Sequence, residues 1–404
     1  MLPAVLADAA GRWGTPLYVT DLDVAAAHLA NWRTAFPDAL IAYAIKANAD
    51  PLLLRRLVAD GAGCEVVTAV ELALARRAGC PPQRIVMNGV GKRDEELHLA
   101  LGAGVLINAE SLAELAALLE LSRDHPGARI GLRLNPGLDA ETHPHLATGA
   151  ATSKFGIPLA QLPEALRLLR DADASLAALG AHIGSAIEST DAYATLAARL
   201  SEGVMTASAA GLPPAAVDLG GGLMSADAEA LAALVAAVRG ELPGARLILE
   251  PGRSLVADAG WLLTRVVRVQ PRPADGLTYL VADAGMTELI RPMRYGAVHP
   301  VALLSPGEAL EVAAGASVHL AGPVCEAGDV LVRDLASWLP PEELRNAGTG
   351  ALLAIERAGA YGAVMASVYN GRLRPAEAVI DGGELRLSRR RETLDDLLSR
   401  DVPG

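Results

Sequence analysis

Residues 40–60 read LIAYAIKANADPLLLRRLVAD and decide the fold. The stretch opens with an uninterrupted apolar run, which is typical of a strand that is buried on both faces. Asp50 and Pro51 follow, a capping residue and a first-turn proline that mark the beginning of a helix. The next residues carry apolar side chains at the helical period. The stretch therefore predicts a strand, a short connection that contains Lys46, and a helix.

The same unit repeats as far as Glu250. Eight apolar runs are present: Leu40–Ile45, Cys64–Val67, Arg84–Met87, Val105–Ile107, Arg129–Leu134, Leu176–Ile183, Ala215–Leu219 and Arg246–Leu249. Amphipathic stretches lie between runs, at Pro51–Asp60, Val70–Ala78, Ser111–Arg123, Leu159–Arg170, Ala192–Ala210 and Asp227–Val238. Such units over about 220 residues predict an α/β fold of the (β/α)8 TIM-barrel type. A doubly wound sheet is the alternative, but its first turn calls for G-x-G-x-x-G, and here that turn reads KANAD.

After Pro251 the pattern changes to short strand-like runs separated by Gly, Pro and Asp turns. The runs are Trp261–Val269, Leu277–Ala282, Ala309–Val312, Val318–Ala321, Ala351–Ile355 and Glu377–Ile380. They predict an all-β domain, an antiparallel β-barrel or sandwich, which Leu17–Val19 joins from the other chain end. We therefore expect a barrel over residues 21–257 and a β domain made of residues 1–20 and 258–404. A short helix is expected at Glu392–Ser399.

Composition limits the partners of the chain. Its 404 residues carry a formal net charge of −12, which argues against a nucleic acid or an anionic membrane as the main partner. No apolar run reaches the ~18 residues of a membrane span, and the N-terminus lacks the charged start of a signal peptide. The three cysteines have no CxxC spacing, and His143 and His145 lack a third ligand, so we expect no metal. These features predict a cytoplasmic protein that binds a small molecule.

Reactive side chains gather at the predicted carboxyl ends of the strands, where (β/α)8 barrels build their sites. Lys46, His182, Gly220–Gly222 and Glu250 each end a run, and alone each has an ordinary structural interpretation. Together they describe a site for pyridoxal 5′-phosphate: a lysine that forms a Schiff base, glycines that admit a phosphate, a histidine that stacks on the ring, and a carboxylate at the pyridine nitrogen. Ser185 is a further phosphate ligand. Polar residues end the other runs: Asn88, Asn108, Arg133, Asn135 and Asp218.

The motifs YAIKAN (43–48), HIGS (182–185), GGG (220–222) and EPGR (250–253) resemble the alanine-racemase-like, fold type III family of pyridoxal phosphate decarboxylases. Other segments resemble the diaminopimelate decarboxylase family in particular. They are Asp139–His143, Lys154–Ile157, Asp283–Met286, Ile290–Pro292, Gly322–Asp329, Gly359–Gly362, Tyr369–Asn370 and Arg374–Glu377. The resemblance covers nearly the whole chain in order. It implies decarboxylation of meso-2,6-diaminopimelate at its D-centre to L-lysine and CO2, the last step of lysine biosynthesis.

The resemblance also implies a role for each matching residue. Lys46 holds the cofactor, His182 stacks on its ring and Glu250 pairs with the pyridinium. The implied phosphate and cofactor contacts are Ser185, Gly220, Gly221, Gly222, Gly252, Arg253 and Tyr361. The implied substrate contacts are Arg253, Arg291, Tyr295, Glu326 and Tyr361, and Cys325 supplies the proton that replaces CO2. In this family the residues that match Cys325 and Glu326 enter the active site from a second subunit, which implies a homodimer with shared active sites.

Three positions depart from the residues that are common in the family: Ala186, Arg294 and Arg357 replace a glutamine, a leucine and an acid. Two of them add positive charge, so another diamino acid, such as ornithine, lysine or carboxynorspermidine, remains an alternative substrate. Arg291 with Tyr295 favours a substrate with a distal carboxylate. A catalytically inactive regulatory homologue is a further alternative, but it would be expected to lose its lysine or its cysteine, and both are present.

Overall fold

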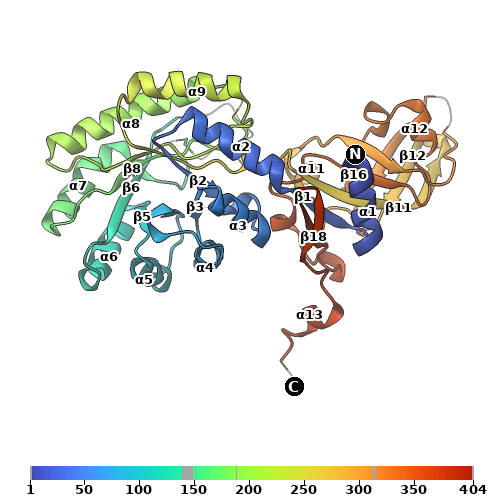
Figure 1. The fold of residues 1–404 in the computed structure, drawn as a ribbon, viewed down its shortest axis with the longest axis horizontal. Helices are drawn as coiled ribbons and strands as arrows, with labels where there is room; N and C mark the ends of the chain where they lie inside the picture. The colour runs from blue at the N-terminus through green and yellow to red at the C-terminus, as the bar shows by residue number, and fades with distance from the viewer. Residues whose placement is uncertain (1, 139–148, 151, 188, 313–314, 403–404) are drawn as a thin grey trace. The chain divides into compact units, whose positions relative to one another are not determined.

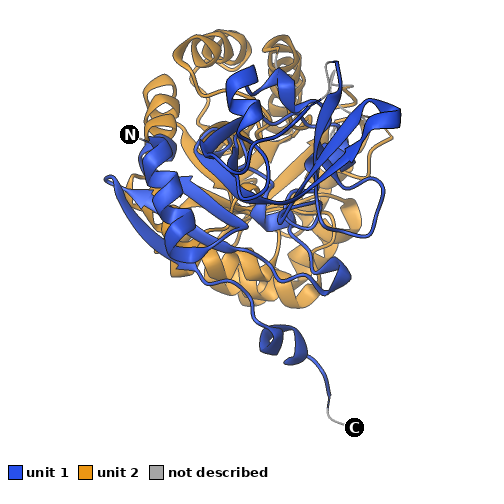
Figure 2. Ribbon diagram, turned by 90° about the vertical axis from the view of Figure 1, so that its right-hand side faces the viewer, with its two compact units in different colours: residues 1–25, 256–404 blue, residues 26–255 orange. Residues whose placement is uncertain are grey.

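The computed structural model describes residues 2–402 except 139–148, 151, 188 and 313–314. The chain divides into two compact units, which Figure 2 shows in different colours. One unit is Ala26–Leu255, and the other combines Met1–Ala25 with Val256–Gly404.

Among the described residues, eight parallel strands of the first unit close into a ring. They are β2 (Leu40–Ala44), β3 (Gly63–Val66), β4 (Ile85–Met87), β5 (Leu106–Ala109), β6 (Arg129–Asn135), β8 (Ala178–Gly180), β9 (Val217–Asp218) and β10 (Leu247–Leu249). The strand order is β5-β4-β3-β2-β10-β9-β8-β6, and pairing of β5 with β6 closes it. The predicted (β/α)8 barrel is therefore confirmed, and each predicted run overlaps one of these strands. A short extra strand, β7 (Ile157–Pro158), pairs with β6 outside the ring.

Helices follow the strands and cover the outside of the ring (Figure 1). They are α2 (Leu22–Ala35), α3 (Pro51–Ala59), α4 (Ala69–Arg77), α5 (Asp94–Ala103), α6 (Leu112–Leu121), α7 (Leu162–Asp171), α8 (Asp191–Ala209), α9 (Ala228–Glu241) and α10 (Arg253–Val256). The predicted cap at Asp50 forms, since its carboxylate accepts the first N–H groups of α3, and the Ser111 hydroxyl likewise accepts one from α6. Both caps satisfy backbone donors that a helix leaves without partners.

Side chains fill the interior of the barrel. One buried layer consists of Ala42, Val86, Leu106, Ala178, Ala216 and Ile248, all from the strands or their ends. Such packing gives the strands a fixed register. The polar residues that follow the strands are therefore held on a rigid frame.

The second unit is a mostly antiparallel sheet with both chain ends in it. Its strands are β1 (Leu17–Asp21), β11 (Gly260–Arg272), β12 (Leu277–Ala282), β13 (Val301–Ser305), β14 (Ser317–Ala321), β15 (Val330–Val332), β16 (Leu352–Ile355), β17 (Ala376–Asp381) and β18 (Glu384–Arg389). β1 lies between β11 and β17, so the N-terminal strand joins the sheet as predicted. The pairings β1–β17 and β12–β14 are parallel, unlike the other pairings of this sheet.

Helices of this unit are α1 (Leu2–Trp13), α11 (Arg291–Tyr295), α12 (Pro341–Arg345) and α13 (Leu394–Leu398). The last lies inside the predicted terminal helix. The first precedes the repeating pattern, which gives no sign of it, and packs its apolar face against β1 and β11. The predicted strand at Ala309–Val312 is wrong, because the N–H of Leu310 donates to the carbonyl of Arg345 instead of to a neighbouring strand.

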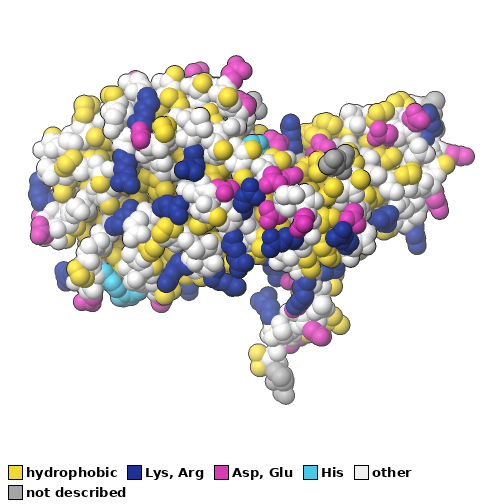
Figure 3. Space-filling model, in the orientation of Figure 1, with side chains coloured by type: hydrophobic (Ala, Val, Ile, Leu, Met, Phe, Trp, Pro, Cys, Tyr) yellow, Lys and Arg dark blue, Asp and Glu magenta, His cyan; other side chains and the backbone are white. Residues whose placement is uncertain are grey.

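No helix in the described part of the chain is long and apolar enough to cross a membrane. On the face seen in Figure 3, Lys and Arg side chains are interspersed with Asp and Glu side chains.

Candidate active site

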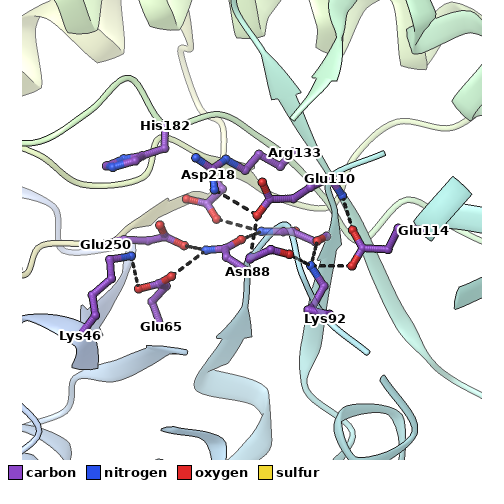
Figure 4. Close-up of polar contacts among 12 residues, drawn as sticks. Lys46, Glu65, Asn88, Lys92, Glu110, Glu114, Arg133, His182, Asp218 and Glu250 are labelled. Atoms are coloured by element: carbon purple, nitrogen blue, oxygen red, sulfur yellow. Dashed lines mark hydrogen bonds and ion pairs between the residues drawn. The ribbon is translucent and has the colours of Figure 1, made fainter. Parts of the chain in front are cut away.

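The site begins at the carboxyl end of β2, where the chain turns tightly through Ile45–Ala47 and presents Lys46. The hydroxyl of Tyr43 donates to the carbonyl of Asn48, 2.9 Å away, and so fixes the turn. The Nζ atom of Lys46 lies 2.7 Å from Oε2 of Glu65 on the neighbouring strand β3 (Figure 4). The lysine side chain is 37% exposed, whereas that of Glu65 is 1% exposed. A buried carboxylate thus holds an amine that remains accessible.

Two amides extend this contact across the barrel. Asn88, which follows β4, donates from Nδ2 to Oε1 of Glu250 at 2.7 Å and to Oε1 of Glu65 at 3.3 Å. Asn108 donates from Nδ2 to Oδ1 of Asn88 at 2.9 Å and to Oδ2 of Asp218 at 3.3 Å. All five side chains come from different strands or their ends, and Figure 4 labels Glu65, Asn88, Asp218 and Glu250. The amide pair therefore connects three buried carboxyl groups.

Burial dominates the titration of two of these carboxyl groups. Desolvation, followed by the nearby charge of Asp218, raises the pKa of Glu250 well above its usual range. Desolvation likewise raises the pKa of Asp218 to about 6. Arg133 lies close by, but its Nη1 is committed to Oε1 of Glu110 at 3.1 Å. Because of these raised pKa values, the buried carboxyl groups at the barrel mouth keep protons at pH values where exposed carboxyl groups lose them.

His182 follows β8 and faces the same cluster (Figure 4). Its Nδ1 accepts the backbone N–H of Gly221 at 3.1 Å, so that nitrogen carries no proton. Desolvation lowers the pKa of the ring well below its usual range, and the charges of Arg133 and Lys46 act in the same direction. His182 is therefore a neutral imidazole at physiological pH.

The three glycines after β9 make a cradle without side chains. Gly220 and Gly222 have φ angles of 63° and 119°, in the region that favours glycine. A Cβ atom on Gly221 would overlap the carbonyl of Glu250, and one on Gly222 would overlap that of Gly184. Only glycine fits, and backbone approach of this kind is what a phosphate group requires.

Ser185 and Arg253 meet beside this cradle, where Nη2 of Arg253 donates to Oγ of Ser185 at 3.2 Å. A Cβ atom on Gly252 would lie 3.1 Å from that of Ala47, next to the lysine turn. Ala186, the departure from the family pattern, adopts a positive φ of 62°. The structure thus brings the predicted phosphate ligands of the barrel to one edge.

The remaining predicted residues belong to the second unit. Arg291 begins α11 and Tyr295 ends it, so the two side chains are one helical turn apart. The guanidinium of Arg294 lies 5.9 Å from the centre of the Tyr295 ring. Arg357 forms an exposed ion pair with Asp258 at 3.2 Å, which explains this departure as a surface contact. Tyr361 has a φ of 57°, another left-handed position for a residue other than glycine.

Cys325 and Glu326 lie on the exposed loop that connects β14 to β15. The N–H of Cys325 donates to Oδ1 of Asn370 at 3.1 Å. Buried Asp329 holds the loop from below, since its carboxylate accepts the N–H of Val324 within the loop at 2.8 Å and that of Met286, after β12, at 2.6 Å. The loop therefore presents the cysteine and the glutamate in a defined backbone conformation.

Sequence reasoning missed Glu65, the partner of the lysine. The available signal was a charged residue inside a strand whose other side chains are apolar. Glu110, which pairs with Arg133, was missed for the same reason. The motif Asp139–His143 and the histidines 143 and 145 lie outside the described residues.

Comparison with known proteins gives consistent matches. Residues 22–257 match the family model for the pyridoxal binding domain of pyridoxal-dependent decarboxylases. The chain is 43% identical over 400 residues to diaminopimelate decarboxylase of Deinococcus radiodurans, covering 98% of each chain. It is 36% identical to that of Aquifex aeolicus, covering 96% of this chain and 92% of the relative. The crystal structure of Helicobacter pylori diaminopimelate decarboxylase complexed with L-lysine superposes with a TM-score of 0.84 at 31% identity, covering 95% and 96% of the two chains.

Proposed function

The chain belongs to the pyridoxal-dependent decarboxylases, among the diaminopimelate decarboxylases, and on this premise we propose that it converts meso-2,6-diaminopimelate to L-lysine and CO2. The carboxylate leaves from the D-centre, and the reaction ends lysine biosynthesis in the cytoplasm. The observation that carries the proposal is the accessible amine of Lys46, held 2.7 Å from buried Glu65 within a cluster of carboxyl groups.

The barrel residues fit pyridoxal 5′-phosphate. When bound, this cofactor accepts the electron pair that the departing CO2 leaves behind. The cradle at Gly220–Gly222 admits no Cβ atom and suits a phosphate, with Ser185, Gly252, Arg253 and Tyr361 as further ligands. Lys46 provides the amine that bonds the cofactor, and Glu65 lies in position to accept its proton.

The charge states of His182 and Glu250 suit their assigned roles at the cofactor ring. His182 is neutral, so it stacks on the ring without opposing the positive charge that the ring nitrogen carries. Glu250 is buried, with a pKa well above its usual range, and holds a proton within the barrel for the ring nitrogen. A protonated nitrogen makes the ring a stronger acceptor of electrons.

The substrate presents a distal carboxylate and a distal ammonium group. We assign Arg253, Arg291 and Tyr295 to the carboxylate, since arginine offers charged, bidentate recognition. Glu326 takes the ammonium, Tyr361 borders the substrate, and Cys325 delivers the proton to the carbon that loses CO2. Ornithine has no distal carboxylate and would leave Arg291 unmatched, which favours diaminopimelate.

The protein acts as a homodimer in which Cys325 and Glu326 serve the site of the second copy. Their loop supports this assignment, because it is exposed yet anchored from below by Asp329. A loop of this kind presents reactive groups outward to a partner. Mixing an inactive Lys46→Ala chain with an inactive Cys325→Ala chain should restore activity by forming mixed dimers.

A substrate panel tests the proposed function. The purified chain with pyridoxal 5′-phosphate is incubated with meso-diaminopimelate, LL-diaminopimelate, L-ornithine and L-lysine, and amine products are identified by mass spectrometry. We expect L-lysine from the meso isomer alone, and no product from the Lys46→Ala control. Turnover of L-ornithine in preference to the meso isomer would overturn the assignment of substrate.

A further inference from the structure

Asp218 is a buried carboxyl group that none of the roles above uses. It ends β9 and is 3% exposed, while Glu250 after β10 is 6% exposed. Its Oδ1 accepts the N–H of Gly220 at 2.9 Å, and its Oδ2 accepts the amide of Asn108 at 3.3 Å. The amides of Asn108 and Asn88, which bond each other, link it to the carboxyl group of Glu250. The two groups line one cavity of about 10 Å³ with Asn88, Asn108, Arg133 and His182.

Two carboxyl groups that line one cavity of this size favour a shared proton. Ionised carboxylates only accept hydrogen bonds, so two of them bond to each other only when one retains its proton. Among the ion pairs of the described residues, neither group has a cationic partner, because Lys46 pairs with Glu65 and Arg133 pairs with Glu110. The asparagine amides donate hydrogen bonds but bring no charge. Two buried negative charges without a counterion are costly, and a shared proton removes one of them.

We propose that Asp218 and Glu250 form a proton-sharing carboxyl pair, in which Asp218 is a positioning residue that sets the proton affinity of Glu250. The inference rests on the proposed function in one respect, namely that Glu250 faces the ring nitrogen of the cofactor. On transfer, the O–H bond of Glu250 breaks, the proton bonds to that nitrogen, and Glu250 becomes a carboxylate. The negative charge of Asp218 stabilises the proton both on Glu250 and on the ring nitrogen.

The surroundings of the pair support a proton held at neutral pH. Glu65 on β3 raises the pKa values of both groups, Lys46 lowers that of Glu250, and Arg133 on β6 lowers that of Asp218. Neutral His182 contributes no charge. Because the folded chain keeps a proton that the unfolded carboxyl groups lose near pH 4, the pair's contribution to stability is present at acid pH and is lost as pH rises through the raised pKa values of the folded pair.

Infrared spectroscopy of the full-length chain without cofactor tests the pair. At pH 7 the wild type should show the C=O band of a protonated carboxyl group, and the band should shift in D2O. Glu250→Gln should lose the band. Asp218→Asn retains an oxygen that accepts the N–H of Gly220, and its amide can donate to Glu250 at any pH. In this variant the band of protonated Glu250 should therefore disappear at a pH at least about one unit lower than in the wild type. The control Asp171→Asn, at an exposed carboxylate on α7, should keep the band unchanged.

Absence of the protonated band in the wild type, or a band that Asp218→Asn leaves unchanged, would overturn the inference. If Asp218→Asn does not fold, Glu250→Gln alone decides whether the band belongs to this pair. The readout uses no cofactor and no substrate, so it can fail while the substrate panel still shows decarboxylation, and the reverse also holds. In the loaded enzyme, Asp218→Asn should lower kcat roughly tenfold with little change in KM, since it alters proton affinity and not substrate contacts.

Discussion

Replacement of Gly220 by alanine tests whether the absence of a side chain at this position is what places His182 beside the glycine cradle. Gly220 has a φ of 63°, where an alanine costs roughly 1 kcal/mol. The added Cβ would lie 2.5 Å from Nδ1 of His182 and 2.9 Å from its Cβ. Because the second atom is at the root of the side chain, rotation of the ring alone does not relieve the overlap.

The size of the effect follows from these distances. Real Cβ atoms keep about 3.0 Å from their neighbours, so the 2.5 Å contact with Nδ1 demands a shift of about 0.5 Å. A misplacement of about 1 Å near a reacting group costs roughly 100-fold in rate, so about half that shift predicts roughly a tenfold loss. The shift also weakens the hydrogen bond from Gly221 to the ring. We expect roughly tenfold weaker binding of pyridoxal phosphate and a comparable fall in kcat.

Gly211→Ala is the matched control, because Gly211 has a similar φ of 79° but nothing within 4 Å of an added Cβ. In denaturant unfolding of the cofactor-free chain, Gly211→Ala should lose roughly 1 kcal/mol for its φ angle alone, and Gly220→Ala should lose more because of the added overlap. Only Gly220→Ala should weaken the cofactor, measured by absorbance titration, and lower turnover. Equal cofactor affinity and turnover in the two variants would refute the idea that the glycine is needed to position His182.

Three further variants probe other contacts. Glu65→Gln should lower kcat roughly tenfold or more, since it removes the carboxylate 2.7 Å from Nζ of Lys46; steady-state kinetics with unchanged kcat would contradict a role in proton transfer. Tyr193→Phe should cost about 1 kcal/mol in urea unfolding, because it removes the hydroxyl that donates to the carbonyl of Gly221 at 3.1 Å. Asp329→Ala should cost roughly 2–3 kcal/mol and speed hydrogen exchange at Val324, in the loop after β14, and at Met286, after β12, as both N–H groups lose their acceptor; exchange at the wild-type rate would argue that other contacts hold the loop.

Much of the barrel was predictable because its information is local. A continuous apolar run indicates a buried parallel strand. A capping residue before an amphipathic stretch indicates the helix that follows, as at Asp50 and Pro51. Since the carboxyl ends of parallel strands meet at one face, the order of runs also places Lys46, His182 and Glu250 around one mouth. The β domain was harder to predict, because its strands are short. At Leu310 a backbone hydrogen bond to the carbonyl of Arg345 replaces the expected pairing with a neighbouring strand.

The sequence alone therefore determined the barrel, the lysine, the glycine cradle and the family. The tertiary structure decided which groups each carboxyl group meets: Glu65 contacts the lysine 19 positions earlier, and Asp218 lines one small cavity with Glu250. Protonation depends on burial and on neighbours that fold in from separate strands, such as Asn88, which lies 162 positions before its partner Glu250. A residue type reveals what a side chain can donate or accept, but only the packed barrel sets which proton it keeps.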